Sequence, residues 1–249
     1  MLEGDVNKNF VAAVGVLSVL ACGAASAQDA VPSGSVVYDA AAFDALPWYV
    51  SGKVGIALPG TIDTTSVTGF GVGPSGKSSF DAGFAGAVAV GKHISPQVRA
   101  ELELGIAINA GRSFEGTYPW GAPSSGSLDG NVTTTTAMAL GYYDFTQFGN
   151  FVPYLSAGLG AAHVSSNLTY TDTVGFSSGT ITGSSMVPAA RIGAGFQYKI
   201  ADSMDLTVDY TALFGGQAAF THNDAFGGST TVNSSVMAHA LAVGVKGSF

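Results

Sequence analysis

Residues 71–78 read Gly-Val-Gly-Pro-Ser-Gly-Lys-Ser, which satisfies the G-x-x-x-x-G-K-[ST] pattern of a phosphate-binding loop. Such a loop binds phosphate when a buried strand precedes it and a helix follows, because backbone N–H groups and the helix dipole then face the ligand. Residues 79–91 instead alternate in polarity with period two and are rich in glycine, so they do not predict a helix. We interpret residues 71–78 as the tip of a loop and predict no nucleotide cofactor.

His163 and Ser165 form a second candidate, because a histidine close to a serine can activate its hydroxyl as a nucleophile. The next acid, Asp172, lies in a polar stretch and no glutamate follows it. We therefore expect a solvated histidine at the base of a loop. The other histidines, His93, His222 and His239, show no metal-ligand spacing, so the sequence predicts no metal site and no cofactor.

A third set consists of charged side chains and one tyrosine spread along the chain. Its members are Lys53, Asp81, Arg99, Glu101, Glu103, Tyr143, Arg191, Asp209 and Lys246. The carboxylates of Glu101 and Glu103 lie two residues apart and could serve acid–base catalysis. The same spacing places both on one face of a strand. Whether that face lines a closed interior or an open site distinguishes a structural role from a catalytic one.

Eight segments alternate between apolar and polar or small residues and predict strands of about the length that crosses a bilayer. They cover about residues 48–58, 80–91, 98–109, 132–143, 151–162, 190–198, 204–214 and 241–249. Helical periodicity is absent. Long polar stretches (59–79, 110–131, 164–187 and 215–235) alternate with short links (92–97, 144–150 and 200–203). This alternation, with both termini on the short-link side, predicts an all-β, closed, up-and-down antiparallel eight-stranded transmembrane barrel.

The apolar face of each strand is expected to meet lipid, and the other face to line the interior. In residues 132–143 the more apolar face contains Met138, Leu140 and Tyr142, which places Tyr143 inside. The nine residues of the charged set would then all be interior. An eight-stranded barrel is filled by its own side chains, and unpaired charges inside it are costly, so we favour a structural ionic network.

Aromatic residues are expected to form girdles at both lipid interfaces. Those predicted for the short-link rim are Trp48, Tyr142, Tyr198 and Phe249, and those for the opposite rim are Phe80, Tyr210 and Phe214.

The N-terminus predicts export. An apolar run over residues 10–21 precedes the small residues Ala24-Ala25-Ser26-Ala27, which is typical of a signal peptide cleaved after Ala27. The alternative is a lipidated Cys22, because residues 19–22 loosely match a lipobox. We predict a signal peptide at 1–27, a short periplasmic segment at 28–46 and the barrel at 47–249.

Composition supports a lipid-facing wall. Only 10% of the residues are charged, compared with about 25% in soluble domains. The formal net charge of −8 argues against nucleic acid as a partner. No stretch reaches the roughly 18 continuous apolar residues of a transmembrane helix.

The sequence also resembles a family. The Gly-Tyr-Tyr-Asp-Phe of residues 141–145, the Val-Pro-Tyr-Leu-Ser-Ala-Gly-Leu-Gly of residues 152–160 and the strand ending at Phe249 resemble small outer-membrane barrels of the OmpA/OmpX kind, above all porin-family surface proteins of α-proteobacteria. The resemblance implies an outer membrane rich in lipopolysaccharide and recognition of Phe249 by the barrel-assembly machinery.

We expect a non-enzymatic, monomeric surface protein that supports the envelope and presents loops to an unknown ligand. The alternatives are a narrow pore or lateral-diffusion transporter for small or hydrophobic solutes, and a lipid A-modifying enzyme.

Overall fold

The computed structural model describes residues 48–59, 62–67, 75–117, 121–172, 178–224 and 228–249. The predicted signal peptide at 1–27, Cys22 and the segment at 28–46 lie outside these ranges. No helix within the described ranges is long and apolar enough to cross a membrane.

Apart from the single 3-10 turn η1 (Thr146–Phe148), the regular structure of the described chain is extended. The strands are β1 (Trp48–Pro59), β2 (Ile62–Val67), β3 (Ser75–Phe80), β4 (Gly83–His93), β5 (Val98–Thr117), β6 (Pro123–Asp144), β7 (Phe151–Asp172), β8 (Ser178–Ala201), β9 (Met204–Asp224) and β10 (Ser229–Ser248).

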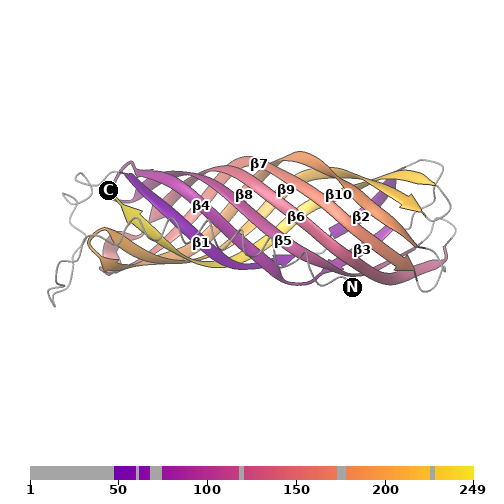
Figure 1. Ribbon diagram of the computed structural model, residues 1–249. Helices are drawn as coiled ribbons and strands as arrows, with labels where there is room; N and C mark the ends of the chain where they lie inside the picture. The colour runs from indigo at the N-terminus through magenta and orange to yellow at the C-terminus, as the bar shows by residue number, and fades with distance from the viewer. Residues whose placement is uncertain (1–47, 60–61, 68–74, 118–120, 173–177, 225–227) are drawn as a thin grey trace.

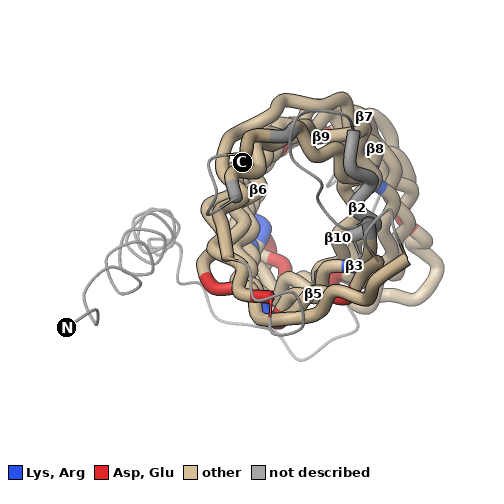
Figure 2. The backbone as a smooth tube through the Cα atoms, turned by 90° about the vertical axis from the view of Figure 1, so that its right-hand side faces the viewer, with Lys and Arg blue, Asp and Glu red and all other residues tan. Residues whose placement is uncertain are grey.

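Eight of the strands, β1 and β4 to β10, form a closed antiparallel ring, which confirms the predicted barrel (Figures 1 and 2). The ring closes where β1 pairs with β10, with Tyr49 opposite Ser248. The N–H of Phe249 also donates a hydrogen bond to the carbonyl oxygen of Trp48, at 2.9 Å. Closure pairs the first strand with the last, so the ring has no free edge along this seam.

The two ends of the ring differ. At the short-turn end lie Trp48, Phe249 and the brief connections from β4 to β5, β6 to β7 and β8 to β9. At the other end, which we call the long-strand end, β5 to β10 continue as strands of 20–24 residues. The prediction of long polar loops at 110–131, 164–187 and 215–235 was therefore wrong over most of these residues. Where water replaces lipid outside the wall, the outward side chains are polar, such as Thr169 and Thr171, and the lipid-facing signal disappears, although inward side chains such as Leu168 remain apolar and buried.

The predicted loop at 59–79 is also partly strand. Beyond β1 and β4 the ring is continued by β2, which pairs with β10, and by β3, which pairs with β5. Between the last β1–β4 pair, Ala57 with Gly83, and the first β2–β3 pair, Ile62 with Ser78, the ladder is interrupted. The side-chain amide of Asn109 donates to the carbonyl oxygens of Ala57 (3.1 Å) and Asp81 (3.0 Å) and ties the two sides together there.

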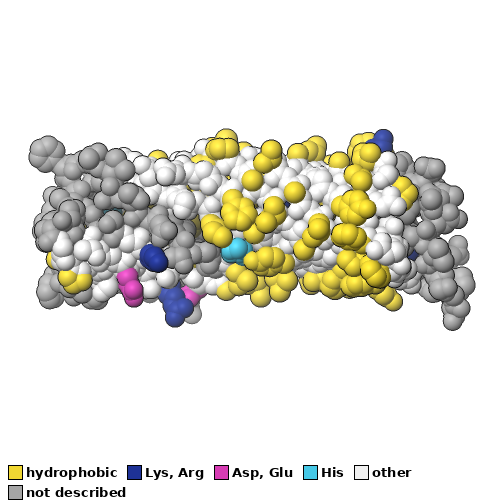
Figure 3. All heavy atoms as spheres, turned by 180° about the vertical axis from the view of Figure 1, so that it is seen from behind, with side chains coloured by type: hydrophobic (Ala, Val, Ile, Leu, Met, Phe, Trp, Pro, Cys, Tyr) yellow, Lys and Arg dark blue, Asp and Glu magenta, His cyan; other side chains and the backbone are white. Residues whose placement is uncertain are grey.

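An apolar belt surrounds the half of the ring nearer the short-turn end. On β5 the outward side chains Leu102 and Leu104 are 63% and 61% exposed. At about 3.3 Å per residue and a tilt of about 40°, the run from Val98 to Ile108 rises roughly 25 Å, the height of the apolar band in outer-membrane barrels. Figure 3 shows the hydrophobic side chains gathered over this half and charged side chains beyond it. The remaining parts of β5 to β10 therefore project beyond the belt.

Aromatic side chains mark the rims of the belt. Of the four predicted for the short-turn rim, Trp48, Tyr198 and Phe249 are 46–60% exposed. Tyr142 is 4% exposed and lies inside the ring, so its assignment to the girdle was wrong, and the outward aromatic side chain of this region is Tyr143. Of those predicted for the opposite rim, Tyr210 and Phe214 are 46% and 42% exposed.

Candidate functional site: an ionic network inside the barrel

The structure places seven of the nine predicted interior residues inside the ring. Six have at most 7% of their surface exposed, and the side chain of the seventh, Arg191, is 11% exposed. The six are Lys53, Arg99, Glu101, Glu103, Asp209 and Lys246. They come from β1, β5, β9 and β10, and Arg191 comes from β8, so the cluster spans the width of the barrel.

The prediction that Tyr143 is interior was wrong. Tyr143 is 50% exposed, whereas its neighbour Tyr142 is buried. The pairing of β5 with β6 opposes Glu101 to Leu140, and opposed residues share a face of the sheet. Because the glutamates face inward, Leu140 and Tyr142 must face inward as well.

The prediction that Asp81 is interior was also wrong. Asp81 lies between β3 and β4 with its side chain 56% exposed, and its nearest cation is Arg112, at 3.8 Å. The side chain of Arg112 is 69% exposed. Strand β4 begins at Gly83, after Asp81. The alternation within residues 80–91 therefore does not determine the direction of the Asp81 side chain.

Arg99 dominates the part of the network nearest the short-turn end. Its Nε donates to both carboxylate oxygens of Asp144, at 3.1 and 3.0 Å, and its Nη1 donates to the hydroxyl of Tyr49 at 3.4 Å. The guanidinium lies 3.9 Å from the centroid of the Tyr142 ring and 4.9 Å from that of Tyr154. A charge-assisted bond and two aromatic faces thus compensate the burial of this cation.

Glu101 lies beside Arg99 and accepts hydrogen bonds from two phenols. Tyr49 and Tyr142 donate to its two carboxylate oxygens at 3.0 and 2.9 Å. Both rings are nearly inaccessible, with exposures of 0% and 4%. The phenols satisfy a carboxylate that would otherwise be costly to bury.

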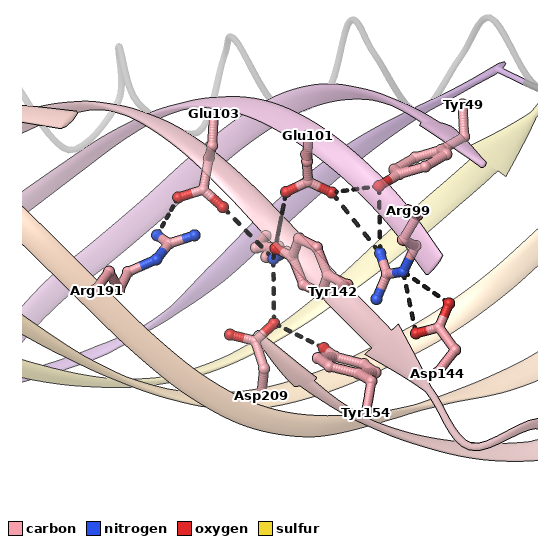
Figure 4. A network of polar contacts seen from close by, with 10 residues as sticks. Tyr49, Arg99, Glu101, Glu103, Tyr142, Asp144, Tyr154, Arg191 and Asp209 are labelled. Atoms are coloured by element: carbon pink, nitrogen blue, oxygen red, sulfur yellow. Dashed lines mark hydrogen bonds and ion pairs between the residues drawn. The ribbon is translucent and has the colours of Figure 1, made fainter. Parts of the chain in front are cut away.

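Lys53 contacts three carboxylates of the network, those of Glu101, Glu103 and Asp209, which are labelled in Figure 4. Its Nζ lies 3.5 Å from Glu103, 3.3 Å from Asp209 and 3.9 Å from Glu101. Arg191 donates from Nη1 to Glu103, at the end of the network opposite Asp144. A separate ion pair joins Lys246 to Asp205 at 2.9 Å.

Four members of the network were not among the predicted site residues: Tyr49, Tyr142, Asp144 and Tyr154. Tyr49 could have been found, because it is two and four residues from the inward Ser51 and Lys53. Tyr142 and Asp144 would have been found if the face of β6 that contains Leu140 had been assigned to the interior. Tyr154, which donates to Asp209 at 3.2 Å, has a weakly patterned strand around it and carried no sequence signal.

The other sequence candidates are not assembled into sites. His163 is exposed on the outward face of β7, whereas Asp172 is buried on the inward face and accepts a hydrogen bond from Ser124 at 2.8 Å. Of the phosphate-loop pattern, residues 71–74 lie outside the described residues, and Ser75 to Ser78 belong to strand β3. Among the residues that the structure describes, no three His, Cys, Asp or Glu side chains lie together so as to hold a metal ion.

Comparison with known proteins agrees with this architecture. The model of the family described as "Outer membrane protein beta-barrel domain" matches residues 14–249. The chain belongs to this family. The outer membrane protein PagN of Salmonella typhimurium is 32% identical over 147 residues, which cover 56% of this chain and 61% of PagN. A putative adhesin of Rickettsia akari is 27% identical over 164 residues, covering 64% of this chain and 71% of the adhesin.

The family and these relatives place the protein in the outer membrane. The chain spans about three-fifths of the length of PagN. Solved structures that are similar in part include Neisserial surface protein A, with 21% identity, a TM-score of 0.45 and coverage of 81% of this chain and 97% of that one. OprG of Pseudomonas aeruginosa is 13% identical with a TM-score of 0.49, covering 81% of this chain and 95% of that one.

Proposed function

We propose that this outer-membrane barrel is a non-enzymatic surface protein that supports the envelope and presents its long-strand end to the outside for attachment. In this orientation both termini and the short turns face the periplasm. The observation that carries the proposal is the wall of paired strands that continues past the apolar belt on β5 to β10.

Such a wall makes a firm contact surface, because most of its backbone N–H and C=O groups are bonded between neighbouring strands; the β8–β9 ladder is interrupted between Thr182 and Ala189. Its outward side chains include exposed threonines: Thr117, Thr169, Thr171, Thr221 and Thr231. Short hydroxyl side chains lose little rotamer freedom when a partner covers them, which favours binding. The similarity to the Rickettsia akari protein named as a putative adhesin supports the same function.

Attachment is tested by expressing the protein on a non-adherent Gram-negative host and counting bacteria bound to cultured animal cells. We expect adherence above the empty-vector level and a severalfold loss when Thr169, Thr171 and Thr221 are all replaced by lysine. The matched control is Gln147→Lys, an exposed position at the short-turn end, which should leave adherence unchanged. Adherence no higher than that of the empty vector, with the protein shown to be present at the surface, would refute the attachment role.

The second candidate function, a narrow pore, is tested in a planar bilayer. The network fills the ring from Asp144 to Arg191, so we expect no steady conductance from the purified protein. We expect openings only in variants that remove large network side chains, such as Arg99→Ala and Arg191→Ala. Steady openings of the unaltered protein that change in size with either substitution would favour the pore instead.

A further inference from the structure

The outside of the wall beyond the apolar belt carries a group of polar side chains on β6 and β7, which we call the amide patch. Asn131 lies directly opposite Asn167, and Asp129 lies directly opposite Thr169. All four residues are exposed. Opposed side chains are about 5 Å apart and successive outward side chains of one strand about 7 Å, so the four mark a rectangle of about the area of one sugar ring.

A β-bulge in β6 lies inside this patch. Residues 128–130 of β6 face only residues 111–112 of β5, so β6 carries an extra residue here. Gly130 lies in the bulge with a φ of 115°, and a Cβ at this position would overlap the carbonyl oxygen of Asn167. Bulges change the direction of nearby side chains and are over-represented next to functional sites. Asp129, within the bulge, is exposed.

The charge of the patch disfavours anionic ligands. Asp129 is its only charged member, and the patch contains no cation. Arg112 lies beside the bulge on β5, but its guanidinium contacts Asp81, at 3.8 Å. A sulphated or phosphorylated ligand would therefore meet a carboxylate of the same sign. An apolar ligand would have to remove water from amides and a carboxylate, which is costly.

The hydrogen-bonding groups of the patch match neighbouring hydroxyls. An amide offers both donors and acceptors, a carboxylate only accepts, and a threonine hydroxyl does both. Because a hydroxyl also donates and accepts, two hydroxyls on adjacent carbons can bond the oxygen and the nitrogen of one amide at the same time. Asn131 and Asn167 provide two such amides side by side, and Asp129 and Thr169 provide partners for further hydroxyls. Uncharged sugars carry hydroxyls on adjacent carbons around one ring.

We propose that the amide patch binds an uncharged sugar and is the part of the attachment surface that recognises its partner. The inference rests on the attachment function proposed above and names the chemistry of the ligand. A few hydrogen bonds at an exposed site bind one sugar weakly, because water competes for every group. Many copies of the protein that face many sugars convert weak contacts into firm adhesion. Thr182, opposite Asn167 on β8, extends the patch by one strand.

The test is binding of vesicles that carry the full-length protein to beads coated with galactose, mannose, N-acetylglucosamine or heparin. The vesicles consist of phosphatidylcholine with a fluorescent lipid, so they present many copies of the protein and no other sugar. We expect retention above that of protein-free vesicles on beads of at least one uncharged sugar, and release by the same sugar in solution. Heparin beads should retain no more vesicles than uncoated beads.

Two variants locate the binding on the patch. Replacing both Asn131 and Asn167 by aspartate keeps the size of each side chain but removes the amide donors, and should lower retention roughly tenfold or more. The matched control is Asn223→Asp, at an exposed asparagine of β9 outside the patch, which should leave retention unchanged. Heat-modifiable gel migration should show that each variant is folded. Equal retention by the double variant and the control would overturn the patch as the binding site.

Three further outcomes would overturn the sugar assignment. Retention on heparin beads alone, lost in Arg112→Gln, would show that the ligand is anionic. Retention abolished by EDTA would show that a metal ion holds the sugar in place of the patch. No retention on any bead, by a protein that still promotes adherence to animal cells, would leave the attachment function standing without the sugar site. Retention on sugar beads without adherence to animal cells would support the sugar site and refute attachment to those cells.

Discussion

Replacing Arg99 by methionine is expected to lower the free energy of unfolding by about 3–5 kcal/mol, the usual cost of leaving one member of a buried ion pair alone. The substitution leaves Asp144, which is 1% exposed, without the cation that bonds both of its oxygens. It also removes the guanidinium that stacks on Tyr142. The measurement is urea-induced unfolding in phospholipid vesicles, followed by tryptophan fluorescence and gel migration.

The double variant Arg99→Met with Asp144→Asn should recover a large part of this loss, because the uncompensated carboxylate is then gone. Arg112→Met provides the matched control, since its side chain is 69% exposed and its pair with Asp81 is long. If the double variant unfolds as readily as the single one, the loss comes from missing volume and the electrostatic explanation fails.

Gly91→Ala is the second change with a large expected effect. Gly91 lies opposite Tyr49 in the β1–β4 pair, and a Cβ at this position would overlap the Tyr49 ring. The ring cannot move aside easily, because it is fully buried and its hydroxyl bonds to Glu101. We expect a loss of about 3 kcal/mol, at the upper end of the range for overpacked cores, measured in the same vesicles.

Gly247→Ala is the control for this prediction. A Cβ at Gly247 would meet no atom within 4 Å, and this glycine lies on β10, which also pairs with β1. Its stability should match that of the unaltered protein. Equal tolerance of alanine at Gly91 and Gly247 would show that the Tyr49 ring can move aside and is not fixed against Gly91.

The strand pattern was readable from the sequence wherever lipid is the outer solvent. In residues 98–104, apolar side chains alternate with Arg99, Glu101 and Glu103 because one side meets hydrocarbon and the other meets the network. The number of strands, their antiparallel order and the closure of the ring all follow from such segments and the short turns between them. These are the features that the structure confirms.

The errors arose where water instead of lipid lies outside the wall, or where apolar side chains fill the interior. Met138 and Leu140 are apolar but face inward, where they join a buried cluster with Val164 and Leu213. Polarity therefore gave the wrong face for β6, and the wrong choice moved Tyr142 out of the network. Only the pairing with Glu101 and Glu103 fixes that face, and pairing is not visible in one strand alone.

The hydrogen bond from Phe249 to Trp48 has a consequence for the order of the chain. Because Trp48 and Phe249 are neighbours, a circularly permuted form of residues 48–249 that joins these two residues and opens the backbone at the exposed turn around Gln147 would keep every strand pairing of the ring. In a test tube it should refold to the same structure. In a cell, β6 would be the last strand of the permuted chain in place of β10. The experiment would therefore separate the stability of the folded ring from the contribution of the C-terminal strand to its assembly in the membrane.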